Sequence, residues 1–354
     1  MDINGLARAF DGRRVLVTGH TGFKGSWLSL WLTRLGATVG GLALPPETQP
    51  HHFGLLDLPM ESLLDDIRQP EPVADAFARL RPEVVFHLAA QPLVRRSYRE
   101  PVATFAANVM GTVHVLEACR ACPDTRAVVV VTSDKCYANR EWPWGYREID
   151  PLGGHDPYSA SKAAAELAAA SYRATFFENG GPLVATARGG NVIGGGDWSE
   201  DRLLPDLVRA MATGASLEIR SPAARRPWQH VLDCLHGYLL LAAGLAAGDR
   251  RLADAWNFGP DPSANATVSE VLEKAAAHWP ALRWHTTTTP QPHEATSLYI
   301  DSAKARAVLG WRPVWDLDAA LGRTITWYRD FLTTGQVSSA AQVEAFAAAA
   351  GAPS

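Results

Sequence analysis

The sequence predicts an α/β fold in which a doubly wound parallel sheet is joined to a smaller, mixed α/β unit. Short β-branched runs alternate with helical patterns from residue 14 to residue 188, a glycine-spaced loop follows the first run directly, and polar side chains follow a later run where it ends. Alternating strands and helices favour a parallel sheet with right-handed crossovers. Such sheets bind their ligands at the edge where the strands end.

Composition and charge argue against several classes of protein. The 354 residues are 47% hydrophobic and 20% charged, with a formal net charge of -4, so we expect no nucleic acid and no acidic membrane as partner. We find no apolar run of the roughly 20 residues that span a bilayer and no signal peptide, and therefore expect a cytoplasmic protein. Four cysteines make no disulfide framework, and Cys119 and Cys122 lack further ligands, so no metal site is predicted.

A glycine-spaced loop follows the first expected strand, residues 14–18, and a helix then runs to about Gly36. The N-terminus of such a helix favours a pyrophosphate, because its N–H groups are unpaired and its dipole is positive there. Gly19 would permit the tight turn, Gly22 the close approach of a phosphate, and Gly25 the close packing of helix on strand. The sequence therefore predicts a dinucleotide site of the Rossmann type.

The second strand, residues 37–44, leaves the choice of dinucleotide open. It ends in Pro45-Pro46, without the acidic residue that would hydrogen-bond an adenosine ribose. The motif alone therefore does not separate NAD from NADP. Further on, Asp66 and its neighbour Ile67 could reach an adenine, and a solvated loop acid is an equally good interpretation.

The alternation then continues along the chain. Further strands are expected at 83–88, 127–131, 183–188, 216–220 and 255–258, and helices at 71–80, 101–119, 157–177, 203–213, 231–247, 267–279, 301–309 and 317–332. The helix after Thr267 should begin with a capping box, and the alanine-rich end from Gln342 should fray. We expect a dinucleotide-binding domain of residues 1–188 plus about 228–258, a substrate domain of about 189–227 plus 259–345, and a frayed tail of 346–354.

Five side chains suit proton and hydride chemistry. Ser133, Asp134 and Lys135 follow the buried strand 127–131 and should emerge at its carboxyl edge. Tyr158 and Lys162 are four apart on a helix and share one face. An ammonium beside a phenol lowers the pKa of the phenol, which could then exchange a proton at neutral pH. An amphipathic surface pair is the plain alternative, but the neighbouring groups favour an active site.

Two loop segments could contact a ligand. Residues 189–198 hold too many glycines for a regular element, so their backbone could approach a ligand or form a flexible connector. The basic, aromatic segment 225–230 suits a charged, planar ligand such as a nucleotide diphosphate, with a surface loop as the alternative.

Together these motifs resemble those of the extended short-chain dehydrogenase/reductases that act on nucleotide sugars. The likeness covers nearly the whole chain and includes the glycine loop, His87-Leu-Ala-Ala90 and Tyr158-x-x-x-Lys162. The acid and amine after Ser133 are similar to those of 4,6-dehydratases, whereas epimerases show a plain hydroxyl pair. A lysine at 135 departs from the Thr-Asp-Glu of thymidine-linked dehydratases and looks like the CDP-glucose 4,6-dehydratases, as do the segments 18–27, 91–95, 150–154, 191–198 and 226–231.

The resemblance implies a tightly bound NAD that is recycled in every turnover, and a nucleotide-sugar substrate. The cofactor would contact Gly19, Thr21, Gly22, Phe23, Gly25, Asp66, Ile67, Leu88, Ala89, Ala90, Asn108, Thr132, Tyr158 and Lys162. The substrate would contact Gln91, Arg95, Asn191, Arg202, Arg226, His230 and Tyr299. The resemblance also implies a homodimer through the helices 101–119 and 157–177, and a place in deoxysugar biosynthesis such as that of lipopolysaccharide O-antigen.

The implied reaction converts CDP-D-glucose to CDP-4-keto-6-deoxy-D-glucose by oxidation at carbon 4, loss of water across carbons 5 and 6, and hydride return to carbon 6. Tyr158 would take the 4-hydroxyl proton and Ser133 would hydrogen-bond that hydroxyl. Asp134 would act as the acid and Lys135 as the base, although the adjacent ammonium lowers the pKa of Asp134, so Lys135 could instead orient the sugar or stabilise the enolate. A UDP-N-acetylhexosamine dehydratase, a 4-epimerase and a non-catalytic NAD-binding scaffold remain as alternatives.

Overall fold

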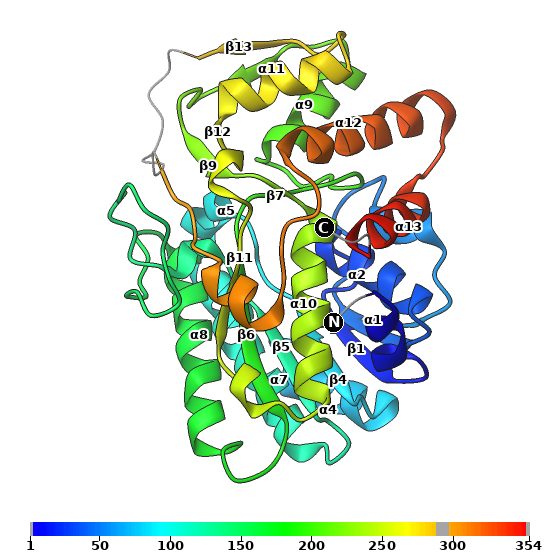
Figure 1. The fold of residues 1–354 in the computed structure, drawn as a ribbon, viewed down its shortest axis with the longest axis vertical. Coiled ribbons are helices and arrows are strands. Elements are labelled where there is room, and N and C mark those ends of the chain that lie inside the picture. The colour runs from blue at the N-terminus through cyan, green and yellow to red at the C-terminus, as the bar shows by residue number, and fades with distance from the viewer. Residues whose placement is uncertain (1–2, 288–296, 352–354) are drawn as a thin grey trace.

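The computed structural model describes residues 3–287 and 297–351. Its centre is a seven-stranded parallel sheet of order β11-β6-β5-β4-β1-β2-β3 (Figure 1). The doubly wound parallel sheet predicted from the sequence is confirmed. The strands are β1 (Arg14–Thr18), β2 (Thr38–Ala43), β3 (Glu61–Leu64), β4 (Val84–His87), β5 (Ala127–Val131), β6 (Leu183–Gly189) and β11 (Ala255–Phe258). Strand order reverses between β1 and β4, which makes that edge the expected ligand site.

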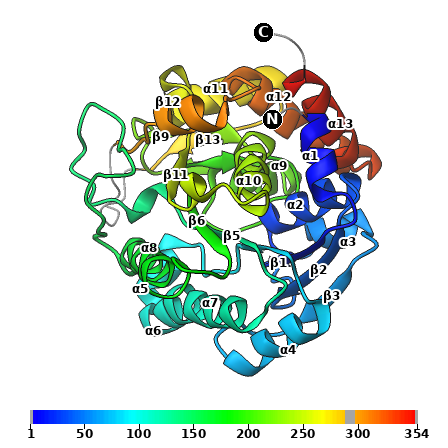
Figure 2. The same cartoon turned by 60° about the horizontal axis from the view of Figure 1, so that its bottom comes forward.

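Helices cover both faces of this sheet (Figure 2). One face packs against α1 (Ile3–Phe10), α2 (Phe23–Arg34) and α10 (Val231–Ala246), and the other against α4 (Pro70–Leu80), α7 (Gly111–Ala121) and α8 (Pro157–Thr175). Each face has its own hydrophobic cluster, because the all-apolar strands send alternate side chains to opposite sides.

The helix expected at 101–119 is one continuous run of α6 (Pro101–Phe105), the π-turn η1 (Ala106–Met110) and α7. By length and composition alone this run could cross a membrane, whereas no such segment was expected from the sequence. In its most apolar 18-residue stretch, 44% of the residues are buried inside the protein. A core helix of a globular protein passes the same test, and the packing of α7 against the sheet is of that kind.

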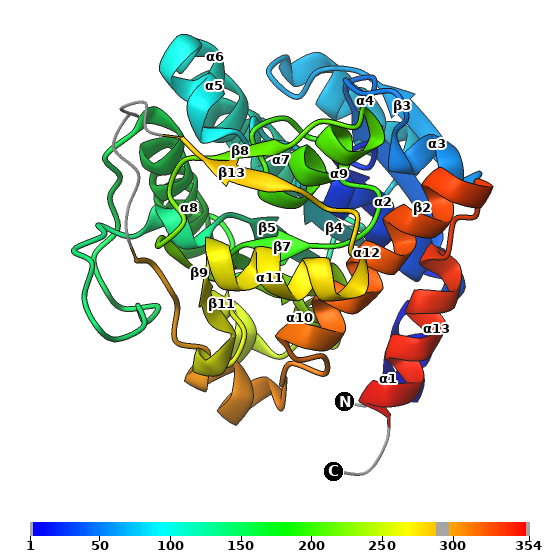
Figure 3. The same ribbon diagram turned by 90° about the horizontal axis from the view of Figure 1, so that it is seen from above.

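A second group of elements lies above the carboxyl ends of the strands (Figure 3). It comprises α9 (Leu203–Ala212), β8 (Leu217–Ile219), β9 (Arg225–Pro227), η4 (Pro262–Ala264), β12 (Asn265–Thr267), α11 (Val268–His278), β13 (Trp284–Thr286) and α12 (Leu317–Thr334). Residues of α9, α11 and α12 share a separate hydrophobic cluster. The predicted capping box is present, since Thr267 and Glu270 bond each other's backbone N–H groups at the start of α11.

Several elements were not predicted from the sequence. They are α1, α3 (His52–Leu56), β3, α5 (Val94–Arg99), the 3-10 turns η2 (Asp134–Cys136), η3 (Arg250–Leu252) and η4, the paired strands β7 (Val192–Ile193) and β10 (Gln229–His230), the strands β9, β12 and β13, and α13 (Ser339–Ala350). The helix expected at 301–309 is largely the π-turn η5 (Ala305–Leu309). The prediction of a frayed end is wrong up to Ala350, because Val343 and Phe346 of α13 are buried and Phe346 packs against Trp31 and Trp315.

Candidate functional site

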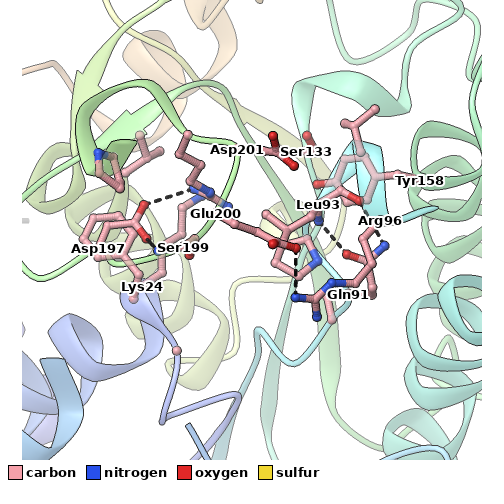
Figure 4. A pocket seen from close by; sticks show the side chains of 18 of the residues that line it. Lys24, Gln91, Leu93, Arg96, Ser133, Tyr158, Asp197, Ser199, Glu200 and Asp201 are labelled. Carbon is pink, nitrogen blue, oxygen red and sulfur yellow. Dashed lines mark hydrogen bonds and ion pairs between the residues drawn. The ribbon is translucent and has the colours of Figure 1, made fainter. Parts of the chain in front are cut away.

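A cavity of about 1920 Å³ runs along the carboxyl edge of the sheet and under the second group of elements. It is lined by the glycine loop, by residues that follow β2, β4 and β5, and by residues of the segment 189–206, which ends in the first turn of α9. Its size suits a dinucleotide together with a second nucleotide-sized ligand. Figure 4 shows the side chains that converge on it from both sides.

The cavity floor is formed by Ser133, Asp134, Tyr158 and Lys162, which come from the end of β5 and the start of α8. The Ser133 hydroxyl accepts a hydrogen bond from Lys135 N at 3.2 Å and donates one to Asp134 Oδ1 at 2.9 Å. It also hydrogen-bonds the Tyr158 phenol. Ser133 therefore links the predicted acid to the predicted phenol in one row of groups.

Asp134 is a buried acid with 3% of its surface exposed. Its Oδ1 accepts from Ser133, while Oδ2 has no hydrogen-bond partner among residues 3–287 and 297–351. Burial raises the pKa of this carboxyl, and this effect outweighs the Lys135 ammonium that lowers it. The Lys135 ammonium lowers the pKa of Asp134, as expected from the sequence, but desolvation has the larger effect.

The pKa values of Tyr158 and Lys162 both follow from burial. Burial raises the pKa of Tyr158 to about 12, and the Ser133 hydroxyl opposes this. Burial lowers the pKa of Lys162 to about 8, assisted by Lys24 and opposed by Glu166. The Lys162 ammonium donates to the backbone oxygen of Val131 at 3.3 Å. The prediction that the phenol has a lowered pKa is therefore wrong for the protein alone, because desolvation dominates.

The glycine loop has no room for side chains at two of its three glycines. Gly19 has φ +78°, and a Cβ there would lie 2.7 Å from Ala89 N. A Cβ on Gly25 would lie 2.0 Å from the Gly19 oxygen. Gly22 caps α2 in an extended conformation, and as a glycine it has no side chain to bond the first N–H groups of the helix. The N–H groups at the start of α2 thus face the cavity, as a bound phosphate requires.

Of the predicted cofactor residues, thirteen line the cavity: Gly19, Thr21, Gly22, Phe23, Gly25, Asp66, Ile67, Leu88, Ala89, Ala90, Thr132, Tyr158 and Lys162. Asn108 does not. It is buried, and it accepts from Gln91 N at 2.8 Å and donates to Gln91 O and Ser161 Oγ. Asn108 thus holds the residue after the β4 loop in place. A side-chain hydrogen bond from Arg68 lowers the pKa of Asp66.

Five of the seven predicted substrate residues also line the cavity: Gln91, Arg95, Asn191, Arg202 and Arg226. His230 does not, because it ends β10 and caps α10 by accepting from Leu232 N at 3.2 Å, and its fully buried ring packs against Trp27 and Trp315. Tyr299 lies outside the cavity lining as well, with its hydroxyl donating to Pro143 O at 2.6 Å. In this structure the His230 ring therefore stabilises the start of α10, and the Tyr299 hydroxyl is bonded to the backbone at Pro143.

Some cavity residues were not predicted. One of them is Lys24 of the glycine loop. Its Nζ lies close to Gly189, since a Cβ added to that glycine would be 3.7 Å away. We define the cavity mouth as Glu47, Arg96, Glu200 and Asp201, which all line the cavity. Arg96 pairs with Glu47 at 2.8 Å and with Glu200 at 3.2 Å, and Arg96 and Glu200 are labelled in Figure 4. Lys24 could have been noticed as the one charge in the predicted glycine loop. The ion pairs of the mouth could not be recognised from a local sequence pattern, since their partners are far apart in sequence.

Comparison with known proteins adds the family. Residues 16–324 match the family model described as GDP-mannose 4,6 dehydratase. The chain belongs to this family. A curated relative, the CDP-glucose 4,6-dehydratase of Salmonella typhimurium, is 48% identical over 331 residues, which cover 91% of this chain and 92% of the relative.

Solved structures share the fold of this dehydratase-family chain. The dTDP-glucose 4,6-dehydratase DesIV from Streptomyces venezuelae, solved with NAD bound, is 25% identical with a TM-score of 0.77, over 92% of this chain and 99% of DesIV. The UDP-glucose 4-epimerase of Thermus thermophilus in complex with NAD is also 25% identical, with a TM-score of 0.78, over 89% of this chain and 99% of the epimerase. A dehydratase and an epimerase therefore share this scaffold, so the fold alone does not separate the two activities.

Proposed function

We propose that the protein is an NAD-dependent nucleotide-sugar 4,6-dehydratase that converts CDP-D-glucose to CDP-4-keto-6-deoxy-D-glucose, a step of deoxysugar biosynthesis. The observation that carries this proposal is the 48% identity over 91% of the chain to a CDP-glucose 4,6-dehydratase. The buried acid of the floor supports dehydration over epimerisation, because loss of water needs a proton donor that epimerisation does not.

NAD fits the glycine loop, because the loop leads into the start of α2, where unpaired N–H groups favour a phosphate. A Cβ at Gly19 or Gly25 would clash with neighbouring backbone and force the loop out of this conformation. NAD bound there would supply a hydride acceptor for carbon 4 and, once reduced, a hydride donor for carbon 6. We assign its binding to the glycine loop, to Asp66 and Ile67 at the adenine end, and to Thr132 and Lys162 at the floor, all of which line the cavity.

The floor residues move the protons. Tyr158 takes the proton of the sugar 4-hydroxyl as a phenolate, since the Lys162 ammonium and the positive nicotinamide of a bound NAD would offset the burial that raises the pKa of Tyr158 in the protein alone. Ser133, hydrogen-bonded to the phenol and to Asp134, holds that hydroxyl. Because burial raises the pKa of Asp134, this carboxyl can hold a proton and donate it to the leaving 6-hydroxyl. Lys135, half-buried beside it, removes the carbon 5 proton. The cavity arginines Arg95, Arg202 and Arg226 bind the nucleotide diphosphate.

The purified protein with added NAD tests the proposal against CDP-, UDP-, GDP- and dTDP-glucose. Mass spectrometry of the products should show loss of one water from CDP-glucose, with far less from the other three. A product of unchanged mass would indicate a 4-epimerase, and a preference for a UDP-linked N-acetylhexosamine would indicate the other dehydratase class. Loss of water from none of these sugars would refute the proposal.

We further propose a cytoplasmic homodimer that pairs through α6, η1 and α8. Apolar side chains project from these helices to solvent: Val102 is 82% exposed, Met110 48% and Leu167 61%. A second copy would cover the apolar half of the 101–121 run that the sheet leaves uncovered. The four cysteines are unpaired, as in a reducing compartment. Light scattering of wild type and Val102→Asp tests the pairing, with a dimer expected for the first and a monomer for the second.

A further inference from the structure

We propose that Glu166 and Arg188 are positioning residues that hold the active-site turn, residues 133–136, from its two ends. Neither residue lines the cavity, and neither belongs to the predicted site. Their ion pair joins Arg188 Nη2 to Glu166 Oε2 at 2.8 Å, and both side chains are only 3% exposed. The inference rests on the proposed dehydratase function, since it concerns the geometry that this chemistry needs.

Glu166 holds the first end of the turn. It lies on α8, one helical turn after Lys162, and so shares a face with it. Its Oε1 accepts a hydrogen bond from the hydroxyl of Thr132, the residue just before the turn. Lys162 donates to the oxygen of Val131 at 3.3 Å. Lys162 and Glu166, on successive turns of α8, thus bond Val131 and Thr132 at the end of β5. These two bonds fix the position of Ser133 relative to Tyr158.

Arg188 holds the second end. Its Nη1 donates to the Tyr137 hydroxyl at 2.7 Å, and its guanidinium carbon lies 4.9 Å from the centre of the Tyr137 ring. Tyr137 is the residue just after the turn, and its hydroxyl donates to Asn257 Oδ1 at 2.7 Å. The same Nη1 donates to Glu148 O at 3.2 Å. The turn that carries Asp134 is therefore held through the residues before and after it.

The chemistry of the pair supports a geometric purpose. Burying two charges is expensive, and well-packed apolar residues often replace such a pair without loss of stability. A charged pair with several directional bonds instead fixes orientation. Gly190, two residues after Arg188, lies beside the acid, since an added Cβ there would lie 3.4 Å from Asp134 Oδ2. The pair thus supports both the turn and the chain segment beside the acid.

The chain offers a matched pair of variants. The hydroxyl groups of Thr132 and Thr186 both donate a hydrogen bond to the Glu166 carboxylate. Thr186 lies on β6, and its Oγ1 is 2.6 Å from Glu166 Oε2. Thr132→Val frees the turn, whereas Thr186→Val removes an equivalent bond that does not touch the turn. We expect both variants to lower the unfolding temperature by a similar small amount. The kcat for water loss should fall by about 100-fold in Thr132→Val alone, as for a displacement on the order of 1 Å, with KM unchanged.

A second variant probes the other end and separates position from fold. Arg188→Lys keeps the charge beside Glu166 but cannot also reach Tyr137 with a planar fork, so its kcat should fall as in Thr132→Val. Titration of NAD by protein fluorescence should give unchanged affinity in Thr186→Val and Arg188→Lys. Because Thr132 is also assigned to the NAD site, kcat of Thr132→Val is measured at saturating NAD. A Thr132→Val enzyme with wild-type kcat at saturating NAD, or a Thr186→Val enzyme that loses as much, would overturn the proposal.

A readout without turnover keeps this inference separate from the function. Hydrogen–deuterium exchange of residues 132–137 should speed up in Thr132→Val and Arg188→Lys and stay unchanged in Thr186→Val. If wild type removes no water from any sugar, the proposed function fails, and exchange alone decides the positioning role. Equal exchange in all variants would then reject it.

Discussion

The cavity floor and the cavity mouth use charge in opposite ways. The floor groups Ser133, Asp134, Tyr158 and Lys162 are each less than 9% exposed, and desolvation is the main cause of the pKa shifts of Asp134, Tyr158 and Lys162. At the mouth, Glu200 is exposed, and it pairs with Arg96 at 3.2 Å and with Arg99 at 3.5 Å.

This difference suits the two tasks. Buried groups change their protonation and keep their geometry, as proton transfer requires. Exposed ion pairs are weak and exchange readily with water and ions, as ligand entry requires. Asp201 illustrates the second case, since it is exposed and lies 3.7 Å from Arg95 and 3.5 Å from Arg220. A substrate diphosphate can compete for these arginines.

The comparison would break most clearly at Asp134. Asp134→Asn cannot donate a proton to the leaving hydroxyl, so we expect the kcat of water loss to fall by about 1000-fold, within the range of general acid catalysis. Oxidation at carbon 4 should survive, visible as reduced nicotinamide absorbance after mixing with CDP-glucose. Mass spectrometry would then find the 4-keto sugar without loss of water. Normal dehydration by Asp134→Asn would remove the acid from our mechanism.

Lys135 is the companion test at the same turn. It is half-buried beside Asp134. Lys135→Ala should also stop water loss after carbon 4 oxidation, and exchange of the carbon 5 proton with deuterated solvent should disappear. A variant that still exchanges this proton would show that Lys135 orients the sugar instead of acting as the base.

Lys162 predicts a measurable dependence of stability on pH in the protein without NAD. Its pKa is about 8 in the folded protein against the usual 10.5, so between these values the unfolded state binds more protons and the free energy of unfolding rises with pH. The difference corresponds to about 3 kcal/mol. The free energy of unfolding in urea should be measured for wild type and Lys162→Met. The difference between the two values should narrow by about this amount from pH 7 to pH 10.5. A gap that does not change with pH would mean that the ammonium is not desolvated.

The floor could be predicted from the sequence because its residues are local. Ser133, Asp134 and Lys135 follow an all-apolar strand, and Tyr158 and Lys162 follow a helix start, so strand and helix periodicity place them. The glycine loop and the order of alternating strands and helices could be predicted for the same reason, because they too are patterns over short stretches of sequence. Protonation states could not be predicted, because they depend on burial by the whole chain.

What could not be predicted depends on long-range packing. The α13 helix has an alanine-rich sequence with no strong amphipathic pattern, and contacts with Trp31 and Trp315 fix it in place. His230 has a ligand-like sequence context, yet the start of α10 turns its ring into the core. The mouth pair Arg96 and Glu200 joins residues that only the tertiary fold brings together.

The mouth gives the smallest expected effect. Arg96→Ala removes the pairs with Glu47 and Glu200, and exposed pairs of this kind contribute at most about 1 kcal/mol each. We expect kcat to stay at the wild-type value and the free energy of unfolding to fall by no more than about 1 kcal/mol. Release of NAD, followed by dilution and fluorescence, should be modestly faster, and the difference from wild type should vanish in high salt because ions screen exposed charges. A large loss of kcat in this variant would mean that the mouth takes part in the chemistry and that its charges are not merely exchangeable contacts.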